Sequence, residues 1–324
     1  MKRVLIFVLT LLTAAMGSVG FAEETPKTTG DIDDKTVSVN YISEVEYPYT
    51  YTDAAGREIT IEHQITAIAV DYLPLWESMT LLGVKPVAAS GSENYIATWD
   101  AFDGYDFSTV TDIGSSEINL ELLAALEPDL ILAQVWDVND MDIANYEKIA
   151  TVAVFSMDTK MDWRLSLREV GKLLGLSQRA EEVIAQVEER LAASRELIKE
   201  EYQDQTVMQI SIMGEDKYYC AWREDLYGET GLGLKTPEGY TTSTNYEQIS
   251  MEAIAQMNPD VIFINLFDGD EAIYEAMTAN SVWQSLTAVK NGRVYLLDGT
   301  GHANSALSTL HTVDFIVESL TQAE

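Results

Sequence analysis

Two segments of this chain decide the fold: NLELLAALEPDLILA at residues 119–133 and SMEAIAQMNPDVIFI at residues 250–264. Each begins with a helix-capping residue, continues through an apolar residue and a glutamate into an apolar helix, and reaches a hydrophobic strand through Pro-Asp. Proline ends a helix and aspartate opens a short loop, so each segment predicts a helix that runs directly into a strand of a sheet. The repetition predicts two related halves within one chain.

Short hydrophobic strands alternate with helices around both segments. ITAIAV at 65–70 and TVAVFSM at 151–157 flank the first segment, whereas VMQISIM at 207–213 and GRVYLLD at 292–298 flank the second. Alternating short strands and helices are typical of a parallel sheet covered by helices. The expected fold class is therefore α/β, with two Rossmann-like lobes that each contain a parallel sheet.

A long helical tract separates the two halves. Asp162 is placed to cap a first helix, and Ser177 a second helix that continues to Tyr202, with acidic residues near its start and Lys199 near its end, as the helix dipole favours. We expect this second helix to join the lobes. The predicted organisation is a signal peptide at 1–22, a mobile acidic leader at 23–46, an N-terminal lobe at 47–161, connecting helices at 162–204 and a C-terminal lobe at 205–324.

The N-terminus has the pattern of a secretory signal. Lys2 and Arg3 precede an apolar run that ends before the small-residue site Gly20-Phe21-Ala22. The run is short for a membrane span, although an uncleaved anchor is the alternative. Cys220 is the only cysteine, which excludes disulfides, a zinc cluster and a lipid-anchoring cysteine after the apolar run. We expect an extracytoplasmic protein that is cleaved after Ala22 and is not lipidated.

The charge of the chain limits its partners. The formal net charge is −33, and the 53 acidic residues are scattered rather than gathered in blocks. Such a chain repels nucleic acid and anionic membrane surfaces, and the scattered pattern favours a solubilising role over an acidic binding patch. We expect a monomer that binds no nucleic acid.

Seven stretches in order along the chain resemble one known family. They are TDAAGREITI, LLGVKPVAAS, DIGSSEINLELLAALEPDLILA, NYEKIATVAVF, DWRLSLREVGKLLG, YEQISMEAIAQMNPDVIFI and LTAVKNGRVYLLD. Together they are similar to the extracytoplasmic substrate-binding proteins of ABC importers that carry ferric siderophores, cobalamin or haem. The resemblance covers nearly all of the chain after the signal peptide. It implies two α/β lobes joined by one long helix, with the ligand in the cleft between them.

Glu121 and Glu252 occupy the second helical position in the two repeated segments, after Asn119 and Ser250. On physical grounds alone, an acid there stabilises the helix dipole by about 0.3–1 kcal/mol. The resemblance implies a further role, because one glutamate on each lobe of these proteins docks onto arginines of the permease dimer. Matched acids on two lobes suit a dimeric partner with a repeated basic pocket.

The carboxyl ends of the strands predict where a ligand lies. Aromatic and polar side chains gather there and suit a large, partly apolar chelate, although each aromatic residue is also compatible with ordinary packing. The candidates are Tyr72, Tyr95, Trp99 and Trp136 in the first lobe, and Tyr219, Trp222, Arg223 and His302 in the second.

Arg223 stands out because arginine is rare in this chain. A guanidinium can hold two acceptor oxygens and stack on a flat ligand. The stretch YYCAWREDLYGETGLGL also resembles the second-lobe segment of hydroxamate-siderophore binders, which implies ligand contact, although here Trp222 and Arg223 are adjacent. The alternative is an ion pair with Glu224 or Asp225.

The predicted function is capture of a ferric siderophore and its delivery to an ABC importer. A haem- or corrinoid-binding protein of the same importer class is the alternative, and haem would require an axial ligand such as His302 or Tyr95. A hydrolase is disfavoured, because neither a Ser-His-Asp signature nor a histidine-rich metal site is present. A purely sensory role stays open. We expect no catalytic residues, no cofactor and no metal site.

Overall fold

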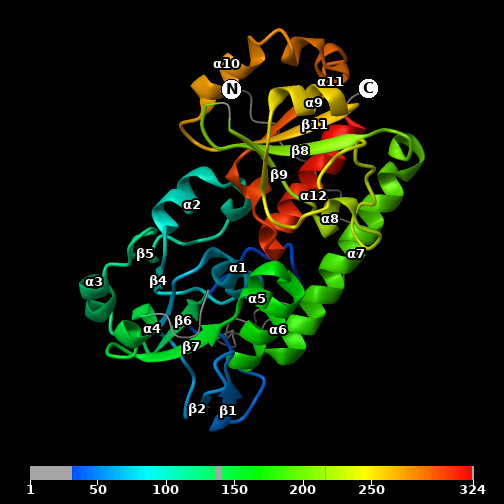
Figure 1. The fold of residues 1–324 in the computed structure, drawn as a ribbon. Coiled ribbons are helices and arrows are strands. Elements are labelled where there is room, and N and C mark those ends of the chain that lie inside the picture. The colour runs from blue at the N-terminus through cyan, green and yellow to red at the C-terminus, as the bar shows by residue number, and fades with distance from the viewer. Residues whose placement is uncertain (1–30, 136–140, 216, 323–324) are drawn as a thin grey trace, which may run out of the picture.

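The computed structural model describes residues 31–135, 141–215 and 217–322. They form two lobes, one above the other in Figure 1, and the helix α7 (Ser177–Tyr202) runs along one side of both. Both the two-lobe α/β fold and the long connecting helix are as the sequence predicts. Within the described residues, no helix is long and apolar enough to cross a membrane.

The first lobe contains a five-stranded sheet in the order β5-β4-β3-β6-β7, in which all neighbouring strands are parallel. The hairpin at its lower end pairs β1 with β2. The strands are β1 (Tyr49–Thr52), β2 (Glu58–Ile61), β3 (Ile68–Val70), β4 (Ala88–Ala89), β5 (Thr111–Asp112), β6 (Leu130–Gln134) and β7 (Thr151–Phe155). The helices are α1 (Leu73–Leu81), α2 (Ser92–Thr98), η1 (Asp100–Phe102), α3 (Leu120–Ala125), α4 (Met141–Tyr146) and α5 (Met157–Met161).

The sheet of the second lobe has the order β10-β9-β8-β11-β12 and is not parallel throughout. The strands β8, β11 and β12 are parallel, as expected, but β9 and β10 are antiparallel to their neighbours. Only a short loop joins β8 to β9, and a parallel crossover needs a dozen or more residues. The strands are β8 (Val207–Ile212), β9 (Tyr218–Cys220), β10 (Glu247–Ile249), β11 (Val261–Leu266) and β12 (Val294–Leu297).

Helices cover this second sheet and link it to the rest of the molecule. Helix α12 packs against α7 and also against α1 of the first lobe, so the last helix belongs to both halves of the core. The helices of this half are α8 (Glu224–Tyr227), α9 (Met251–Met257), α10 (Glu271–Thr278), η2 (Trp283–Ser285), α11 (Thr287–Lys290), η3 (Gly299–His302) and α12 (Ala306–Thr321).

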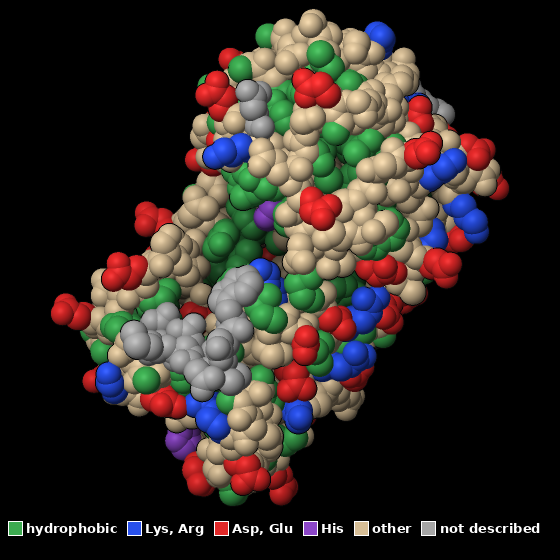
Figure 2. All heavy atoms as spheres, viewed as in Figure 1, with side chains coloured by type: hydrophobic (Ala, Val, Ile, Leu, Met, Phe, Trp, Pro, Cys, Tyr) green, Lys and Arg blue, Asp and Glu red, His purple; other side chains and the backbone are tan. Residues whose placement is uncertain are grey.

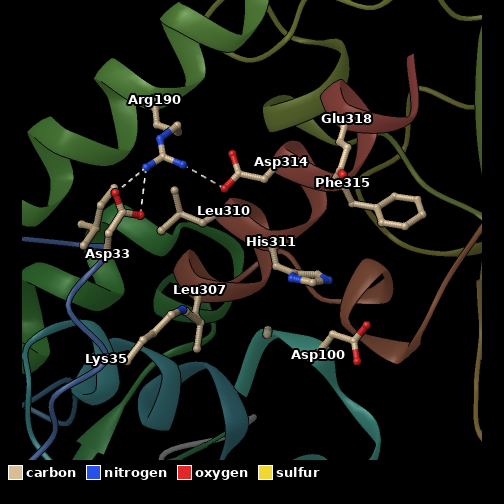
Figure 3. A pocket seen from close by; sticks show the side chains of 12 residues that line it. Asp33, Lys35, Asp100, Arg190, Leu307, Leu310, His311, Asp314, Phe315 and Glu318 are labelled. Atoms are coloured by element: carbon tan, nitrogen blue, oxygen red, sulfur yellow. Dashed lines mark hydrogen bonds and ion pairs between the residues drawn. The ribbon is translucent and has the colours of Figure 1, made fainter. Parts of the chain in front are cut away.

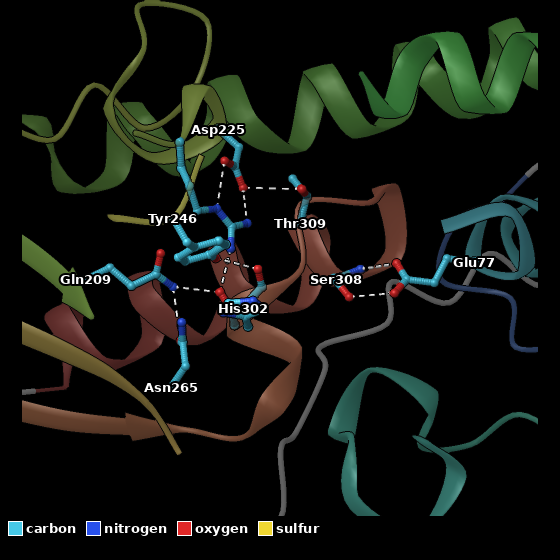
Figure 4. Close-up of polar contacts among 10 residues, drawn as sticks. Glu77, Gln209, Asp225, Tyr246, Asn265, His302, Ser308 and Thr309 are labelled. Carbon is cyan, nitrogen blue, oxygen red and sulfur yellow. Dashed lines mark hydrogen bonds and ion pairs between the residues drawn. The ribbon is translucent and has the colours of Figure 1, made fainter. Parts of the chain in front are cut away.

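Glu77 of α1 fixes the contact between α1 and α12. Its side chain is fully buried, and its two carboxylate oxygens accept hydrogen bonds from the backbone N–H (2.8 Å) and the hydroxyl (2.6 Å) of Ser308 (Figure 4). Ser308 lies in the first turn of α12, where backbone N–H groups lack partners within the helix. The first lobe thus caps a helix of the second.

The connecting helices α6 (Trp163–Leu173) and α7 pack against each other. Helix α6 is capped by Asp162, as predicted, because the Asp162 carboxylate accepts from the backbone N–H groups of Arg164 and Leu165. The start of α7 is different: Ser177 is already helical, and its side chain does not cap it. Instead, the Glu44 carboxylate accepts from the backbone N–H groups of Gln178 (2.8 Å) and Arg179 (2.9 Å).

The predicted mobile leader is wrong for residues 31–46, which we call the N-terminal strap. Ile32 and Tyr41 are buried in the core, and Ser38 forms a parallel bridge with Val84. Arg190 of α7 binds Asp33 of the strap (Figure 3). The prediction failed because the segment is mostly polar and only a few of its residues contact the core. These few contacts suffice to order the segment. The predicted signal peptide and residues 23–30 lie outside the described residues.

Candidate functional site

A cleft of about 490 Å³ lies between the two lobes. Figure 2 shows the molecule hollowed there, with hydrophobic side chains gathered in the hollow. The first lobe contributes Tyr72, Tyr95, Trp99, Lys160 and Met161, and the second contributes Met213, Tyr246, Phe267 and His302.

Aromatic rings form the wall of the first lobe. Tyr95 of α2 packs edge-on against Trp99, with ring centroids 4.8 Å apart. Trp99 in turn touches the second lobe at Gly299, where a Cβ atom would lie only 2.4 Å from the indole Nε1. Residue 299 therefore has to be glycine for the lobes to meet at this point. Tyr72, at the start of α1, and both of these rings line the cleft as the sequence predicts.

His302 lies at the centre of the second wall. Its Nδ1 is 2.9 Å from the Ser211 hydroxyl, and its ring stacks on Tyr246 with centroids 3.9 Å apart (Figure 4). Burial, reinforced by the nearby charges of Arg223 and Lys160, lowers the pKa of His302 to about 4. The imidazole is thus neutral at pH 7 and presents an aromatic surface to the cleft.

Two buried amide side chains, those of Asn265 and Gln209, support the position of His302 through hydrogen bonds. Asn265 donates to the Ser211 hydroxyl, at 2.9 Å. Gln209 donates both to the Asn265 side chain, at 3.1 Å, and to the carbonyl of Gly301, at 2.9 Å. All three side chains are at least 95% buried, so the orientation of His302 is fixed by satisfied groups rather than by solvent.

Arg223 does not face the cleft, contrary to the prediction. Its side chain is 3% exposed and binds Asp225 through two nitrogens, while a third donates to the carbonyl of Gly301. The alternative of an ion pair is thus confirmed, but in the interior and not at the surface. The reason is the antiparallel direction of β9, whose end runs away from the carboxyl edge of β8.

The remaining predicted ligand contacts do not line the main cleft among the described residues. Trp222 lines a neighbouring cavity, described below, and not the main cleft. Tyr219 is half-buried within β9, paired in register with Ser211, and lies outside both sets of lining residues. Trp136 lies outside the described residues.

Several cleft residues were missed by the sequence analysis. Lys160 and Met161 follow the carboxyl end of β7, so the rule that found the other candidates applies to them too. Tyr246 precedes the antiparallel strand β10 and had no such signal. Burial lowers the pKa of Lys160. The charge of the lining is distinctive, because no described carboxylate lines this cleft although the chain has 53 acidic residues.

Glu121 and Glu252 are placed as the repeated segments predict. Asn119 caps α3 by accepting from the backbone N–H of Leu122, and Ser250 caps α9 by accepting from that of Ala253. Both glutamates are exposed in the first turn of their helices, one on each lobe. This geometry is compatible with dipole stabilisation and with docking alike.

One group of potential metal ligands was not foreseen. The carboxylates of Asp100 and Asp298 and the His311 imidazole bring their ligand atoms within 4.8 Å of one another. Asp298 already accepts hydrogen bonds from the backbone N–H groups of Asp100 and Thr300. These contacts join η1 of the first lobe to η3 of the second and account for the position of Asp298.

Comparison with known proteins agrees with this geometry. The family model described as periplasmic binding protein matches residues 77–300. The iron(3+)-hydroxamate-binding protein FhuD of Bacillus subtilis is 30% identical over 225 residues, which are 66% of this chain and 69% of that protein. The ferric enterobactin-binding periplasmic protein FepB of Escherichia coli is 28% identical over 282 residues, 79% of this chain and 86% of that protein.

Solved structures show the same fold. The siderophore-binding protein FhuD of Vibrio cholerae with bound Fe³⁺-Desferal superposes with a TM-score of 0.67 at 21% identity, covering 81% of this chain and 99% of that one. The family match spans both lobes, the connecting helix and most residues of the cleft. This chain is therefore a member of the periplasmic binding protein family.

Proposed function

We propose that this protein captures a ferric siderophore in the cleft between its lobes and delivers it to an ABC importer. The observation that carries the proposal is the lining of the cleft, in which aromatic rings from both lobes face each other without any described carboxylate. A chelate that wraps its iron presents a large, mostly apolar surface and needs no iron ligand from the protein. The relatives named above, which bind ferric siderophores, support the assignment.

The cleft favours a chelate of low net charge. Lys160 is the only lysine or arginine among the described lining residues, and His302 is neutral. A trianionic iron complex would be desolvated here against a single ammonium, which is unfavourable. Neutral or weakly charged chelates, such as ferric hydroxamates, avoid this cost.

Haem is the second candidate, and His302 is the observation that favours it. A neutral imidazole held at Nδ1 has the protonation state and the orientation of an axial iron ligand. The variant His302→Ala distinguishes the two candidates. It abolishes the axial bond to haem iron, and so haem binding, but removes only one of several contacts to a siderophore.

The test is a binding screen that follows tryptophan emission. The purified protein is titrated with ferrichrome, ferrioxamine B, a ferric catecholate, ferric citrate, haem and cobalamin. Quenching by a ferric hydroxamate with a dissociation constant of about 1 μM or below supports the proposal. Binding of haem alone, lost in His302→Ala, replaces it with the second candidate, and binding of none of these ligands contradicts both.

We further propose that Glu121 and Glu252 dock the two lobes onto the permease dimer. Their exposed carboxylates occupy equivalent positions on the two lobes, which suits a partner with a repeated basic pocket. The double variant Glu121→Arg/Glu252→Arg is expected to bind ligand normally but to lose most uptake in cells that depend on this protein. Glu189→Arg, an exposed acid on α7, is the matched control. Normal uptake by the double variant contradicts docking.

Residues 1–22 are proposed to direct the chain out of the cytoplasm and to be removed after Ala22, leaving an unlipidated protein. N-terminal sequencing and intact-mass measurement of the exported protein test both points. A mature N-terminus elsewhere, or a mass increased by a lipid, contradicts the proposal.

A further inference from the structure

A second cavity of about 310 Å³ adjoins the main cleft and shares Met161, Thr244 and Asn304 with it. We call it the side compartment. The connecting helices contribute Trp163 and Leu191 to its lining, and the second lobe contributes Trp222. The space between the lobes therefore holds two adjoining cavities that share Met161, Thr244 and Asn304 as lining residues.

The side compartment differs from the main cleft in charge. Two arginines line it, but each has a carboxylate partner: Arg223 binds Asp225, and Arg164 binds Glu188 at 2.6 Å. The guanidinium of Arg164 also stacks on Trp163, 4.2 Å from the ring centroid. Neither cation is therefore available to an incoming ligand.

Three acids of the described chain line the compartment, and Glu224 is the one that neither binds a cation nor caps a helix. It is exposed, and its carboxylate has only long contacts, at 3.4 Å from the Trp222 indole nitrogen and at 3.5 Å from the Thr230 hydroxyl. Among the described residues, no lysine or arginine lies within ion-pair distance of it. Asp162, another of the lining acids, adds further negative charge while it caps α6.

A carboxylate beside an indole ring is the combination that recognises an ammonium group. The carboxylate supplies an ion pair and a hydrogen-bond acceptor, and the ring face attracts a cation through its quadrupole. In the main cleft the described lining offers the opposite chemistry, with an ammonium from Lys160 and no carboxylate. A ligand that fits both cavities has a chelate body of low or negative charge and a cationic arm.

We infer that the side compartment binds an ammonium-bearing arm of the siderophore, between Glu224 and Trp222, while the iron chelate occupies the main cleft. This inference rests on the proposed function and adds the ligand class: a ferric chelate with a pendant amine. The arm passes Met161, whose unbranched side chain is 39% exposed and can adjust to it.

The test compares two ligands that differ only in the charge of the arm. Ferrioxamine B is a linear ferric trihydroxamate that ends in a primary ammonium, and acetylation of that amine removes the charge but leaves the chelate intact. The wild-type protein is expected to bind the amine form about five- to tenfold more tightly, as an exposed ion pair with a cation–π contact allows. The preference should shrink as salt is raised.

Protein variants assign the effect to the compartment. Glu224→Gln keeps the size of the side chain and removes the ion pair, so the preference is expected to fall to about twofold, which the Trp222 indole alone supports. Glu229→Gln, at an exposed acid of the same segment that does not line the compartment, is the matched control and keeps the preference.

Equal binding of both forms by the wild type overturns the inference, as does a preference that is undiminished in Glu224→Gln. Binding of ferrichrome but not of ferrioxamine B also overturns it, while leaving the proposed function intact. If no ferric chelate of the earlier screen binds, the proposed function fails instead, so the two failures are distinguishable.

Discussion

At the scale of single residues, Arg223 and His302 are neighbours with opposite roles. Arg223 is buried as a charged group, whereas His302 is neutral and lines the cleft. Gly301 links them, because Arg223 donates to the carbonyl that precedes His302. The sequence identified both residues as notable but not which one faces the ligand. Glu224 and Asp225 both follow Arg223 closely in sequence, and only the folded structure shows that Asp225 is the partner.

Arg223→Ala is expected to destabilise the fold by about 3–5 kcal/mol, because it leaves the Asp225 carboxylate buried without its counter-charge. Chemical denaturation of the free protein measures the effect. The double variant Arg223→Met/Asp225→Leu, which removes both charges, should recover much of the loss. Unchanged stability together with weakened ligand binding would show that Arg223 faces the ligand after all.

His302 predicts a pH dependence of stability. Its folded pKa of about 4 is below the value near 6.5 of an unfolded histidine, so the stabilisation is present above pH 6.5. As the pH falls from 6.5 to 4, His302 is protonated in the unfolded chain but stays neutral in the folded protein. The free energy of unfolding therefore decreases by about 3 kcal/mol over this range. Denaturation at pH 7 and 4.5 should therefore show a smaller loss in His302→Gln than in the wild type. Identical losses would contradict the neutral, buried state.

At the scale of elements, the positions of most helices and strands follow from local sequence, but their pairing partners do not. The apolar pattern of LPLWESMTLLG at 73–83 predicts a helix, and nothing in that pattern indicates that the Glu77 carboxylate is fully buried. Its partner Ser308 is 231 residues away in sequence. Burial raises the pKa of Glu77, and the hydrogen bonds from Ser308 oppose this effect.

Glu77→Ala is expected to cost about 1–3 kcal/mol and to loosen the contact between α1 and α12, since the first turn of α12 loses its acceptor. Thermal and chemical unfolding measure the loss. Hydrogen exchange at the backbone N–H of Ser308 should also accelerate. Glu275→Ala, at an exposed acid on α10, is the control and should change stability by less than about 0.5 kcal/mol. A fully stable Glu77→Ala protein would contradict the role of this cap.

At the scale of the whole molecule, the repeated segments correctly predicted two lobes and the long tract between them predicted one connecting helix. The presence of two adjoining cavities was not predictable, because it depends on side chains from both lobes and from α7 meeting in space. The strap was also missed, since its anchors are too few to give a periodic pattern.

This architecture predicts little closure on ligand binding. A continuous helix of 26 residues resists bending, and the cap on α12 holds the lobes together at a second point. Small-angle scattering with and without ligand should show a change in radius of gyration of about 1 Å or less. A larger contraction, of the kind that flexible hinge strands allow, would contradict a rigid frame.

The strap also sets an order of events during synthesis. Residues 31–46 leave the ribosome before the rest of the described chain, yet the Glu44 carboxylate caps α7 from 134 positions away and Asp33 binds Arg190 across 157 positions. The earliest part of the described chain therefore has to wait, without its native partners, until the connecting helix has been made. Its polar composition suits this interval, because a waiting segment with little apolar surface has little tendency to aggregate. The mobile leader that the sequence predicts therefore corresponds to the strap before the connecting helix has been synthesised.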